Sequence, residues 1–325
     1  MKRKMEISEL IFKIIAYVVL ILFALMCVYP LIFALAATFS DPLAVNKNLV
    51  VLWPASVDGG IGFSINAFKV VLESSQFWIY YSNTFFVTFL GTCWSMFFTI
   101  FAAYALSKRR LMGRHAWNFF LVFTMWFSAG IVASYNNFQR TGEIFAAFVG
   151  GDNMYDIDLK WLVVIAMGAN ATNLILLRNA FEGVPSEIEE AARIDGATEF
   201  QILWRVYIPM SKATIATVAL FFGVGRWNGY FWSYKIMGSQ QSYNWPVQVY
   251  LRDFIDKYTN MTFKLDPDEL SKGFVPPGVD WDPVKGNATS IAYAMVLLSI
   301  IPILIVYPFV QKYFAKGVNM GGVKE

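Results

Sequence analysis

The densest cluster of carboxylates in this 325-residue sequence is one short stretch, EIEEAARIDGATEF, from Glu187 to Phe200. It holds five acids in fourteen residues, whereas only 15% of the chain is charged and 57% is hydrophobic. Its alanines offer a small surface that another backbone can approach closely, while its acids favour water. We interpret the stretch as a helix that docks into a groove of a soluble partner, because a merely solvated loop would not need the alanine face. The five acids are Glu187, Glu189, Glu190, Asp195 and Glu199.

Local signals predict the shape of this stretch. Ser186 and Glu189 form an S-x-x-E capping box, in which the Ser186 hydroxyl caps a helix and Glu189 reaches back to the Ser186 amide. Glu189 is also four residues before Arg193, so the two are expected to form an ion pair on one face of that helix. The opposite face carries Ile188, Ala191, Ala192 and Asp195.

A glycine turn is expected next. Gly196 suits the left-handed position that ends a helix, and Thr198 to Gln201 is a second capping box. The sequence therefore predicts a short helix, a tight turn, and a second helix that runs toward Pro209 and the following membrane span.

The rest of the sequence offers little that suits catalysis or metal binding. His115 is the one histidine and has no second His, Cys or nearby carboxylate, and no G-x-x-x-x-G-K-[ST] loop occurs. Cys27 and Cys93 lie in apolar runs, where a free cysteine acts as a small hydrophobe. The net charge of +3 is too small to indicate nucleic-acid binding. We expect a chain with no catalytic residue, no metal site, no cofactor of its own and no ATP hydrolysis by itself.

Arg226 stands out because a charge inside an apolar span costs several kcal/mol unless it meets water or a partner. Two interpretations stay open. Arg226 either lies near the outer interface with its charge in water, or lines a solute path with Trp227, Asn228 and Tyr230. The G-x-x-x-G spacing that begins at Gly225 favours close helix packing over a binding role.

Membrane spans must position these side chains. A mean hydropathy of +0.49 and 18% aromatic residues indicate one lipid-embedded unit, in which each span needs about 20 mostly apolar helical residues. The basic start and first apolar run resemble a secretory signal, but the run exceeds the roughly 7–15 residues of a signal core. Six stretches qualify as spans: Ile14–Ala37, Trp78–Leu106, Trp117–Ala133, Trp161–Leu177, Ala213–Trp232 and Ile291–Val310.

The distribution of Lys and Arg predicts the orientation. With both termini in the cytoplasm, the inner segments hold 15 of the 26 basic residues but only 9 of the 23 acidic ones, a net charge of +6 against −3 for the remainder. The acidic stretch then lies in the cytoplasm. Two long loops, Phe39–Phe77 and Ser233–Ala288, lie outside. The prolines and aromatic side chains of the second loop are typical of a folded loop that faces a partner.

A longer pattern now connects these features. Glu190-Ala191-Ala192, Gly196, and Val206 to Pro209 are spaced as in E-A-A-x3-G-x9-I-x-L-P, the signature of permease subunits in bacterial ABC importers, with conservative replacements at two positions. Further segments are similar to the carbohydrate-uptake branch, related to the maltose-transporter permease and to polysaccharide-type permeases. The resemblance covers about Trp78 to the C-terminus, although Ala133 stands where a proline is expected. The further segments are Ala103–Arg109 with Gly113, Met125–Ser128, Asn173–Ile175 with Arg178, Gly225–Asn228 and Lys316–Val318.

The resemblance implies a fold and a division of the chain. The fold is an all-α integral membrane protein of six transmembrane helices, the type I ABC importer permease fold with a cytoplasmic coupling helix. Residues 1–77 would hold the N-terminal segment, first helix and first outer loop, residues 78–312 the transmembrane domain with coupling loop 185–209 and outer loop 233–288, and residues 313–325 a cytoplasmic tail. The ATPase-coupling residues would be Glu190, Ala191, Ala192, Gly196, Val206, Ile208 and Pro209.

The resemblance also implies a function. The chain would be the permease of an ATP-driven, binding-protein-dependent importer in a bacterial cytoplasmic membrane, moving an oligosaccharide or polysaccharide fragment inward. ATP and Mg²⁺ would bind the partner ATPase, and closure of that ATPase would move the short helix as a lever through Pro209 into the fifth span. The partners would be a second, homologous permease, two copies of an ATP-binding subunit, and an extracytoplasmic solute-binding protein. Trp245, Tyr250 and Trp281 would lie in the loop that probes the binding protein's cleft.

Two other classes of protein are alternatives to an importer permease. A secondary transporter driven by an ion gradient would call for charged residues inside the spans or an inverted repeat, and the sequence shows no carboxylate in its clearest spans and no such repeat. A membrane scaffold without transport activity could carry the docking loop alone, but the full signature argues against it. The identity of the sugar is not encoded in any motif of this chain.

Overall fold

The structure is a computed structural model that describes residues 7–127, 129–259 and 288–317. Apart from one isolated bridge between Ala55 and Ile61, every regular element in these residues is helical. The chain divides into two compact units. The first comprises Met1–Phe77 with Leu251–Ser299, and the second comprises Trp78–Tyr250 with Ile300–Glu325.

The first unit begins with one long apolar helix, α1 (Ile7–Thr38). Most of its large side chains are exposed, as expected of a helix whose solvent is lipid. The segment after α1 packs against the end of that helix through small buried residues, among them Ala36 and Ala37 of α1 and Ala44 of the segment. Asp41 caps the next helix by accepting a hydrogen bond from the Leu43 amide at 3.1 Å. The other elements of the first unit are α2 (Pro42–Asn46), α3 (Asn66–Glu73), η4 (Ile255–Thr259) and the first half of α17 (Ala288–Gly317). The helix α14 (Val247–Phe254) begins in the second unit.

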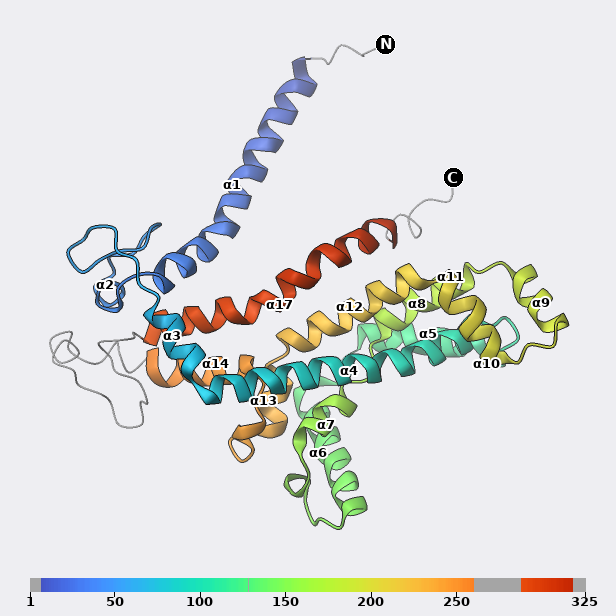
Figure 1. The fold of residues 1–325 in the computed structure, drawn as a ribbon. Coiled ribbons are helices and arrows are strands. Elements are labelled where there is room, and N and C mark those ends of the chain that lie inside the picture. The colour runs from blue at the N-terminus through green and yellow to red at the C-terminus, as the bar shows by residue number, and fades with distance from the viewer. Residues whose placement is uncertain (1–6, 128, 260–287, 318–325) are drawn as a thin grey trace. The chain divides into compact units, whose positions relative to one another are not determined.

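The second unit is built along α4 (Ser75–Ser107), with the acidic stretch at the carboxyl end of that helix (Figure 1). Two apolar clusters hold it together. The first, which we call the Trp245 cluster, joins α4 to α7 and α13. The second, which we call the Phe181 cluster, joins α4 to α8, α12 and the segment after the acidic stretch. The helices are α5 (Arg114–Trp126), α6 (Gly130–Val149), α7 (Leu159–Ala166), α8 (Ala171–Glu182), α9 (Ser186–Ile194), α10 (Glu199–Ile202), α11 (Ile208–Met210), α12 (Lys212–Asn228) and α13 (Phe231–Met237), with short turns η1 (Met154–Asp156), η2 (Leu203–Tyr207) and η3 (Ser242–Asn244).

The described residues hold three to six candidate membrane spans. Helices α1, α4 and α17 are each long and apolar enough to cross a bilayer. Three further pairs qualify only when both members are counted together: α5 with α6 bends by 117°, α7 with α8 by 49°, and α10–α11 with α12 by 86°. The predicted spans 117–133 and 161–177 are therefore broken rather than continuous, and α6 passes through Ala133 without ending there. The predicted span 213–232 also breaks, because α12 stops at Asn228 and α13 begins at Phe231.

The beginning of the predicted outer loop 233–288 is folded onto α4 and α7. Gln241 accepts a hydrogen bond from the Leu159 amide at 3.0 Å and donates to the Ile157 carbonyl at 2.7 Å. The prediction that Trp245 faces a partner is wrong, since Trp245 is 5% exposed and donates to the Gly238 carbonyl at 2.7 Å. Its ring packs inside the Trp245 cluster because the loop folds back on itself. Trp281, the prolines at 267, 276, 277 and 283, and the tail beyond residue 317 lie outside the described residues.

Candidate functional site

The acidic helix α9 runs from Ser186 to Ile194 and ends as the sequence predicts. Gly196 has φ +82°, the left-handed conformation that glycine adopts without strain. The Ala197 amide donates to the Ala192 carbonyl at 3.0 Å, and the Gly196 amide donates to the Arg193 carbonyl at 3.1 Å. These two bonds satisfy carbonyls that the last turn of a helix leaves free. The predicted glycine turn is confirmed.

The two predicted capping boxes differ in outcome. Around α10, the Gln201 amide donates to the Thr198 hydroxyl at 3.3 Å and the Thr198 amide donates to the Gln201 side chain at 2.9 Å, so this box is confirmed. At the start of α9 no side chain caps the helix, and the predicted box of Ser186 and Glu189 is wrong. Glu189 is engaged elsewhere, by groups far away in the sequence.

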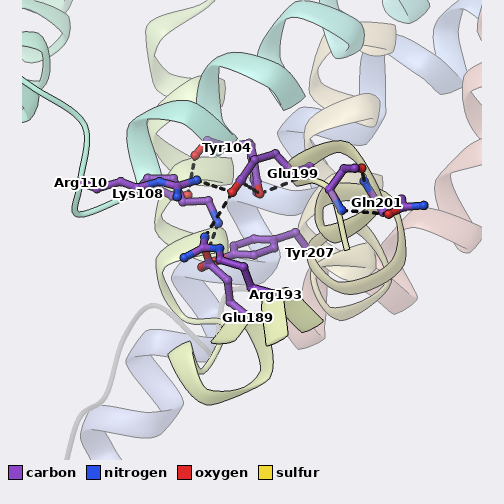
Figure 2. A network of polar contacts seen from close by, with 10 residues as sticks. Tyr104, Lys108, Arg110, Glu189, Arg193, Glu199, Gln201 and Tyr207 are labelled. Atoms are coloured by element: carbon purple, nitrogen blue, oxygen red, sulfur yellow. Dashed lines mark hydrogen bonds and ion pairs between the residues drawn. The ribbon is translucent and has the colours of Figure 1, made fainter. Parts of the chain in front are cut away.

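Glu189 is held by the carboxyl end of α4 (Figure 2). Lys108 Nζ lies 2.9 Å from Glu189 Oε2, and the two side chains are only 9% and 14% exposed. The same ammonium lies over the rings of Tyr104 and Tyr207, 4.1 Å and 4.0 Å from their centroids. The Tyr207 hydroxyl donates to Glu189 as well. A cation between two tyrosine rings and a carboxylate is stabilised on three sides.

A second carboxylate extends the same network. The Tyr104 hydroxyl donates to Glu199 Oε2 at 2.7 Å, and Arg110 pairs with the other oxygen of Glu199. Arg193 bridges the two acids, because it pairs with Glu189 one turn earlier and with Glu199 Oε1 at 3.2 Å. The predicted pair of Glu189 and Arg193 is confirmed. Three segments, the end of α4, α9 and α10 with η2, therefore meet in one polar network (Figure 2).

Burial and pairing shift the pKa values of the central ion pair in defined directions. Burial lowers the pKa of the Lys108 amine below its ordinary 10.5, more than its neighbour Glu189 raises it. Burial also acts to raise the pKa of the Glu189 carboxyl, but the hydrogen bonds from Lys108 and Tyr207 outweigh it and hold that pKa below 4.5. The Glu189 carboxyl is therefore ionised at neutral pH.

The opposite side of α9 is open to solvent and partly apolar. Ile194 is 86% exposed and Ile188 is 41% exposed, and Glu190 and Ala191 are exposed beside them. The prediction that both alanines face outward is wrong for Ala192, which packs against the Phe181 cluster of the same chain. Lys108 turns Glu189 inward, and Ala192 lies one turn further along the same side of the helix.

The second half of the signature lies in the helical segment that leads into α12. Val206 and Ile208 pack against the Phe181 cluster, and Pro209 is exposed. The residues from Leu203 to Tyr207 form a π-helical turn. An 86° bend follows between Met210 and Lys212. A proline lacks an amide hydrogen and a π turn is wider than an α turn, so the helix changes direction here.

Arg226 fits neither of its two predicted settings. It is 7% exposed, and its guanidinium donates to the Val164 carbonyl at 3.1 Å, the Met167 carbonyl at 2.9 Å and the Ser95 hydroxyl at 2.9 Å. The carbonyls belong to the last turn of α7 and the residue that follows, which have no partner within their own helix. A positive charge at the carboxyl end of a helix is also favourable. Arg226 therefore joins α12, through hydrogen bonds, to the break between α7 and α8.

The other residues of the predicted solute path differ in their exposure. Trp227 is 5% exposed and packs edge-on against Phe85 at 5.0 Å between ring centroids. Asn228 and Tyr230 are exposed at the end of α12. The predicted close packing at Gly225 is not seen, because the space beside it is open within 4 Å. Gly91 of α4 is the glycine that allows a close approach, since a Cβ there would overlap the Arg226 guanidinium.

The sequence alone did not reveal Lys108, Tyr104 and Tyr207 as partners of the acidic helix. Lys108 and Tyr104 lie in the segment Ala103–Arg109, whose pattern marks it as important without indicating its role. More than 80 positions separate Lys108 from Glu189, so no local spacing connects them. Within the described residues, no group of three or more His, Cys, Asp or Glu side chains is arranged to hold a metal ion.

The fold and this site define a class: a helical membrane subunit with a short, partly exposed acidic helix that is attached to its spans by a buried ion pair. Residues 89–320 match the family described as binding-protein-dependent transport system inner membrane component, and the chain belongs to that family.

One relative of known sequence and two of known structure are similar to this chain over nearly its whole length. A polygalacturonan/rhamnogalacturonan transport system permease, YtcP of Bacillus subtilis (strain 168), is 34% identical over 97% of this chain and 98% of its own. The structure of a bacterial ABC transporter involved in the import of the acidic polysaccharide alginate contains a chain that is 36% identical with a TM-score of 0.77, covering 96% of this chain and 100% of that one. A bacterial alginate ABC transporter in complex with an alginate pentasaccharide-bound periplasmic protein shares the fold, with a TM-score of 0.62 at 15% identity over 93% of each chain.

Proposed function

We propose that this chain is the permease subunit of an ATP-driven importer that moves an oligosaccharide or polysaccharide fragment into the cytoplasm. The single observation that carries the proposal is the two-sided character of α9. Its inner side is fixed to the spans by Glu189, while its outer side exposes Ile188 and Ile194 beside Glu190. A helix that transmits force between two proteins needs both a firm attachment and a free contact surface.

The attachment suggests how force passes into the membrane. Motion of α9 would reach α4 through Lys108 and the π-helical segment before α12 through Tyr207. Lever action through Pro209 would then be one of two routes rather than the only one. Because an ATPase can shift the transporter only through contacts that differ between its states, α9 would serve as the element that senses nucleotide-driven closure.

The proposed assembly follows the family. A second, homologous permease would complete the pore, and two ATP-binding subunits would bind the α9 helices and supply ATP and Mg²⁺ chemistry. A solute-binding protein would deliver the sugar on the outer face, with both termini of this chain in the cytoplasm and six spans in the bilayer. Of the relatives above, the two that exceed 30% identity are described as transporting polygalacturonan or rhamnogalacturonan and the acidic polysaccharide alginate, so oligosaccharides of these polymers are the first substrates to test.

Substitution of Ile194→Glu tests the docking surface. Ile194 contacts little in its own chain, so the variant should fold and insert normally. When it is co-expressed with the partner permease and ATPase, retention of the ATPase on an affinity-tagged permease should fall at least tenfold, and uptake should fall with it. The control is Asp195→Asn, a conservative change at the exposed residue next to Ile194, which should retain the ATPase normally. Normal ATPase retention by Ile194→Glu would contradict docking through this side of α9.

A further inference from the structure

Two cavities lie between the helices of the second unit, and their walls differ in chemistry. The larger, about 790 Å³, lies among α4, α12 and α17, and its wall is mostly apolar, with the side chains of Thr88, Thr92, Trp227 and Tyr307 as the ones that carry a polar atom. The smaller, about 510 Å³, lies among α4, α5 and the break between α7 and α8. Both volumes are in the range of ligand pockets. Polar atoms form a much larger share of the wall of the smaller cavity than of the larger one.

The polar side chains of the smaller cavity keep hydrogen-bonding capacity that the described part of the chain does not use. Thr99 of α4 is 4% exposed, and its hydroxyl makes no hydrogen bond with any part of the chain that the structure describes. Asn170 caps α8 by accepting from the Asn173 amide at 3.0 Å, which leaves its own amide hydrogens without a described acceptor. Thr124 of α5 donates to the Leu121 carbonyl at 2.7 Å and keeps its acceptor capacity.

The backbone adds donors to the same wall. Ala171 and Thr172 line the cavity and form the first turn of α8, a twelve-residue helix. Amides in the first turn of a helix have no acceptor within that helix, and they favour oxygen atoms that carry negative charge. Inside a bilayer an unsatisfied polar group costs several kcal/mol, so such a concentration of free donors and hydroxyls calls for a polar occupant.

The remaining wall is apolar. Phe98, Leu121 and Met125 face the same space from α4 and α5. A sugar ring matches this division, because its hydroxyls both donate and accept hydrogen bonds while its C–H face packs on aromatic and aliphatic side chains. A lipid chain would leave the donors unsatisfied, and a water cluster would not use the apolar wall.

We propose that the cavity at the α7–α8 break binds one sugar unit of the oligosaccharide as it crosses the membrane. Thr99, Thr124 and Asn170 bind the hydroxyls, and the first turn of α8 binds a hydroxyl or carboxylate oxygen. The proposal rests on the proposed function and assigns the solute contact to α4, α5 and α8 rather than to Arg226, which is occupied by backbone carbonyls.

The first test is the variant Thr99→Val, which removes a hydroxyl at nearly constant volume. The matched control is Thr92→Val on the same helix, because the Thr92 hydroxyl is also without a described partner but lines the apolar cavity. The complete transporter with its binding protein, in lipid vesicles, is given labelled oligogalacturonate, alginate oligosaccharide and maltodextrin as probes. Uptake per ATP hydrolysed should fall about three- to tenfold for Thr99→Val, the effect of one neutral hydrogen bond, and should stay within about twofold for Thr92→Val.

The second test is protection of a cysteine from labelling. In a chain with Cys27→Ser and Cys93→Ser, Thr124→Cys lines the cavity and Phe120→Cys, on the same helix, does not. The transported probe should slow the reaction of a small thiol reagent at position 124 at least threefold and leave position 120 unchanged. Uptake of none of the probes by the unaltered chain would contradict the proposed function, and with it this site. Uptake by the unaltered chain with no protection at 124, or with Thr99→Val equal to Thr92→Val, would overturn the site alone.

Discussion

At the residue scale, Lys108 explains why adjacent acids of one helix behave differently. Glu189 lies on the side of α9 that meets α4, and the Lys108 ammonium between two tyrosine rings gives its carboxylate a fixed partner. Glu187 and Glu190 lie on either side of it in sequence and are exposed. Adjacent positions on a helix point about 100° apart, so one inward acid is naturally flanked by outward ones. The acidic stretch therefore contains both an anchor and a solvated surface.

Substitution of Lys108→Met should loosen α9 without displacing α4. Methionine keeps the length and apolar stem of lysine but removes the charge that Glu189 and the two tyrosine rings share. Hydrogen bonds to charged groups contribute about 1.5–3 kcal/mol, and Glu189 keeps its bonds to Tyr207 and Arg193, so we expect a loss near the lower end of that range. Hydrogen exchange of the amides of residues 190–195 in the purified transporter should accelerate about tenfold.

Arg110→Met is the matched control for Lys108→Met. Arg110 pairs with Glu199, but the two side chains are 55% and 45% exposed, and exposed pairs contribute at most about 1 kcal/mol. Exchange in α9 should change less than about fivefold in this variant. Equal effects of the two substitutions would show that the buried position of Lys108 has no special part in holding the helix.

Acid should release α9 only well below neutral pH. The folded-state pKa of Glu189 lies below 4.5, so its contribution to stability is fully present above the unfolded value and is lost as the pH falls through the lower folded value. A spin label on Ile194→Cys, in a chain with both native cysteines replaced, should keep constant mobility from pH 8 to pH 5 and become mobile only below pH 4.5, as the Glu189 carboxyl takes up a proton.

Two variants assign that transition to one carboxyl group. Glu189→Gln has no titratable group at this position and should show no transition of its own between pH 5 and pH 3. Glu199→Gln should keep it, because the ion pair of Glu189 with Lys108 remains. A transition in Glu189→Gln like that of the unaltered chain would assign the pH dependence to another residue.

At the element scale, the sequence correctly predicted the features that depend on hydrogen bonds and ion pairs between residues close together in the chain. The glycine turn at Gly196, the capping box at Thr198 and the pair of Glu189 with Arg193 were correct because each depends on residues within four positions. The helix start at Ser186 was also correct, but the capping box of Ser186 and Glu189 and the direction of Ala192 were wrong, because Lys108 and the Phe181 cluster, distant in sequence, determine where Glu189 and Ala192 lie. Hydropathy likewise located the apolar stretches but missed their breaks, since a break between two half-helices leaves the average composition unchanged.

The α7–α8 break depends on a close fit that hydropathy does not register. Arg226 reaches across α4 at Gly91 to bond the end of α7, and the lack of a side chain at Gly91 makes room for the guanidinium. The arginine that looked costly in a span satisfies backbone carbonyls that the break leaves free. The three helices α4, α7 and α12 are therefore joined at one point.

Gly91→Ala tests this fit against Gly225→Ala as a matched control. A methyl group at Gly91 would overlap the Arg226 guanidinium, whereas the space beside Gly225 is open, and both residues lie inside helices. We expect Gly91→Ala to lower the free energy of unfolding by about 1–3 kcal/mol, the usual cost of overpacking. Gly225→Ala should be neutral or stabilise by up to about 1 kcal/mol through helix propensity. Thermal unfolding of the purified protein in detergent measures both, and a neutral Gly91→Ala would mean that Arg226 can bond α7 from another position.

At the scale of the whole molecule, the bent pairs decide the topology. If only α1, α4 and α17 span the bilayer, everything between α4 and α17 lies on one side, including both α9 and the loop after α13. If each bent pair is also a span, α9 stays inside and the loop after α13 lies outside.

Cysteine labelling from outside the cell distinguishes them. With Cys27 and Cys93 replaced by serine, Ser239→Cys places a thiol at an exposed position in the loop after α13. A membrane-impermeant maleimide should react with it in intact cells whose outer barrier is permeabilised, because the six-span arrangement puts that loop outside. Asp58→Cys should react in either arrangement, and Ile194→Cys should react only after the inner membrane is broken. Labelling at position 239 that also requires a broken membrane would support three spans, and α9 would then share a compartment with the loop expected to meet the binding protein, which is incompatible with the importer proposed here.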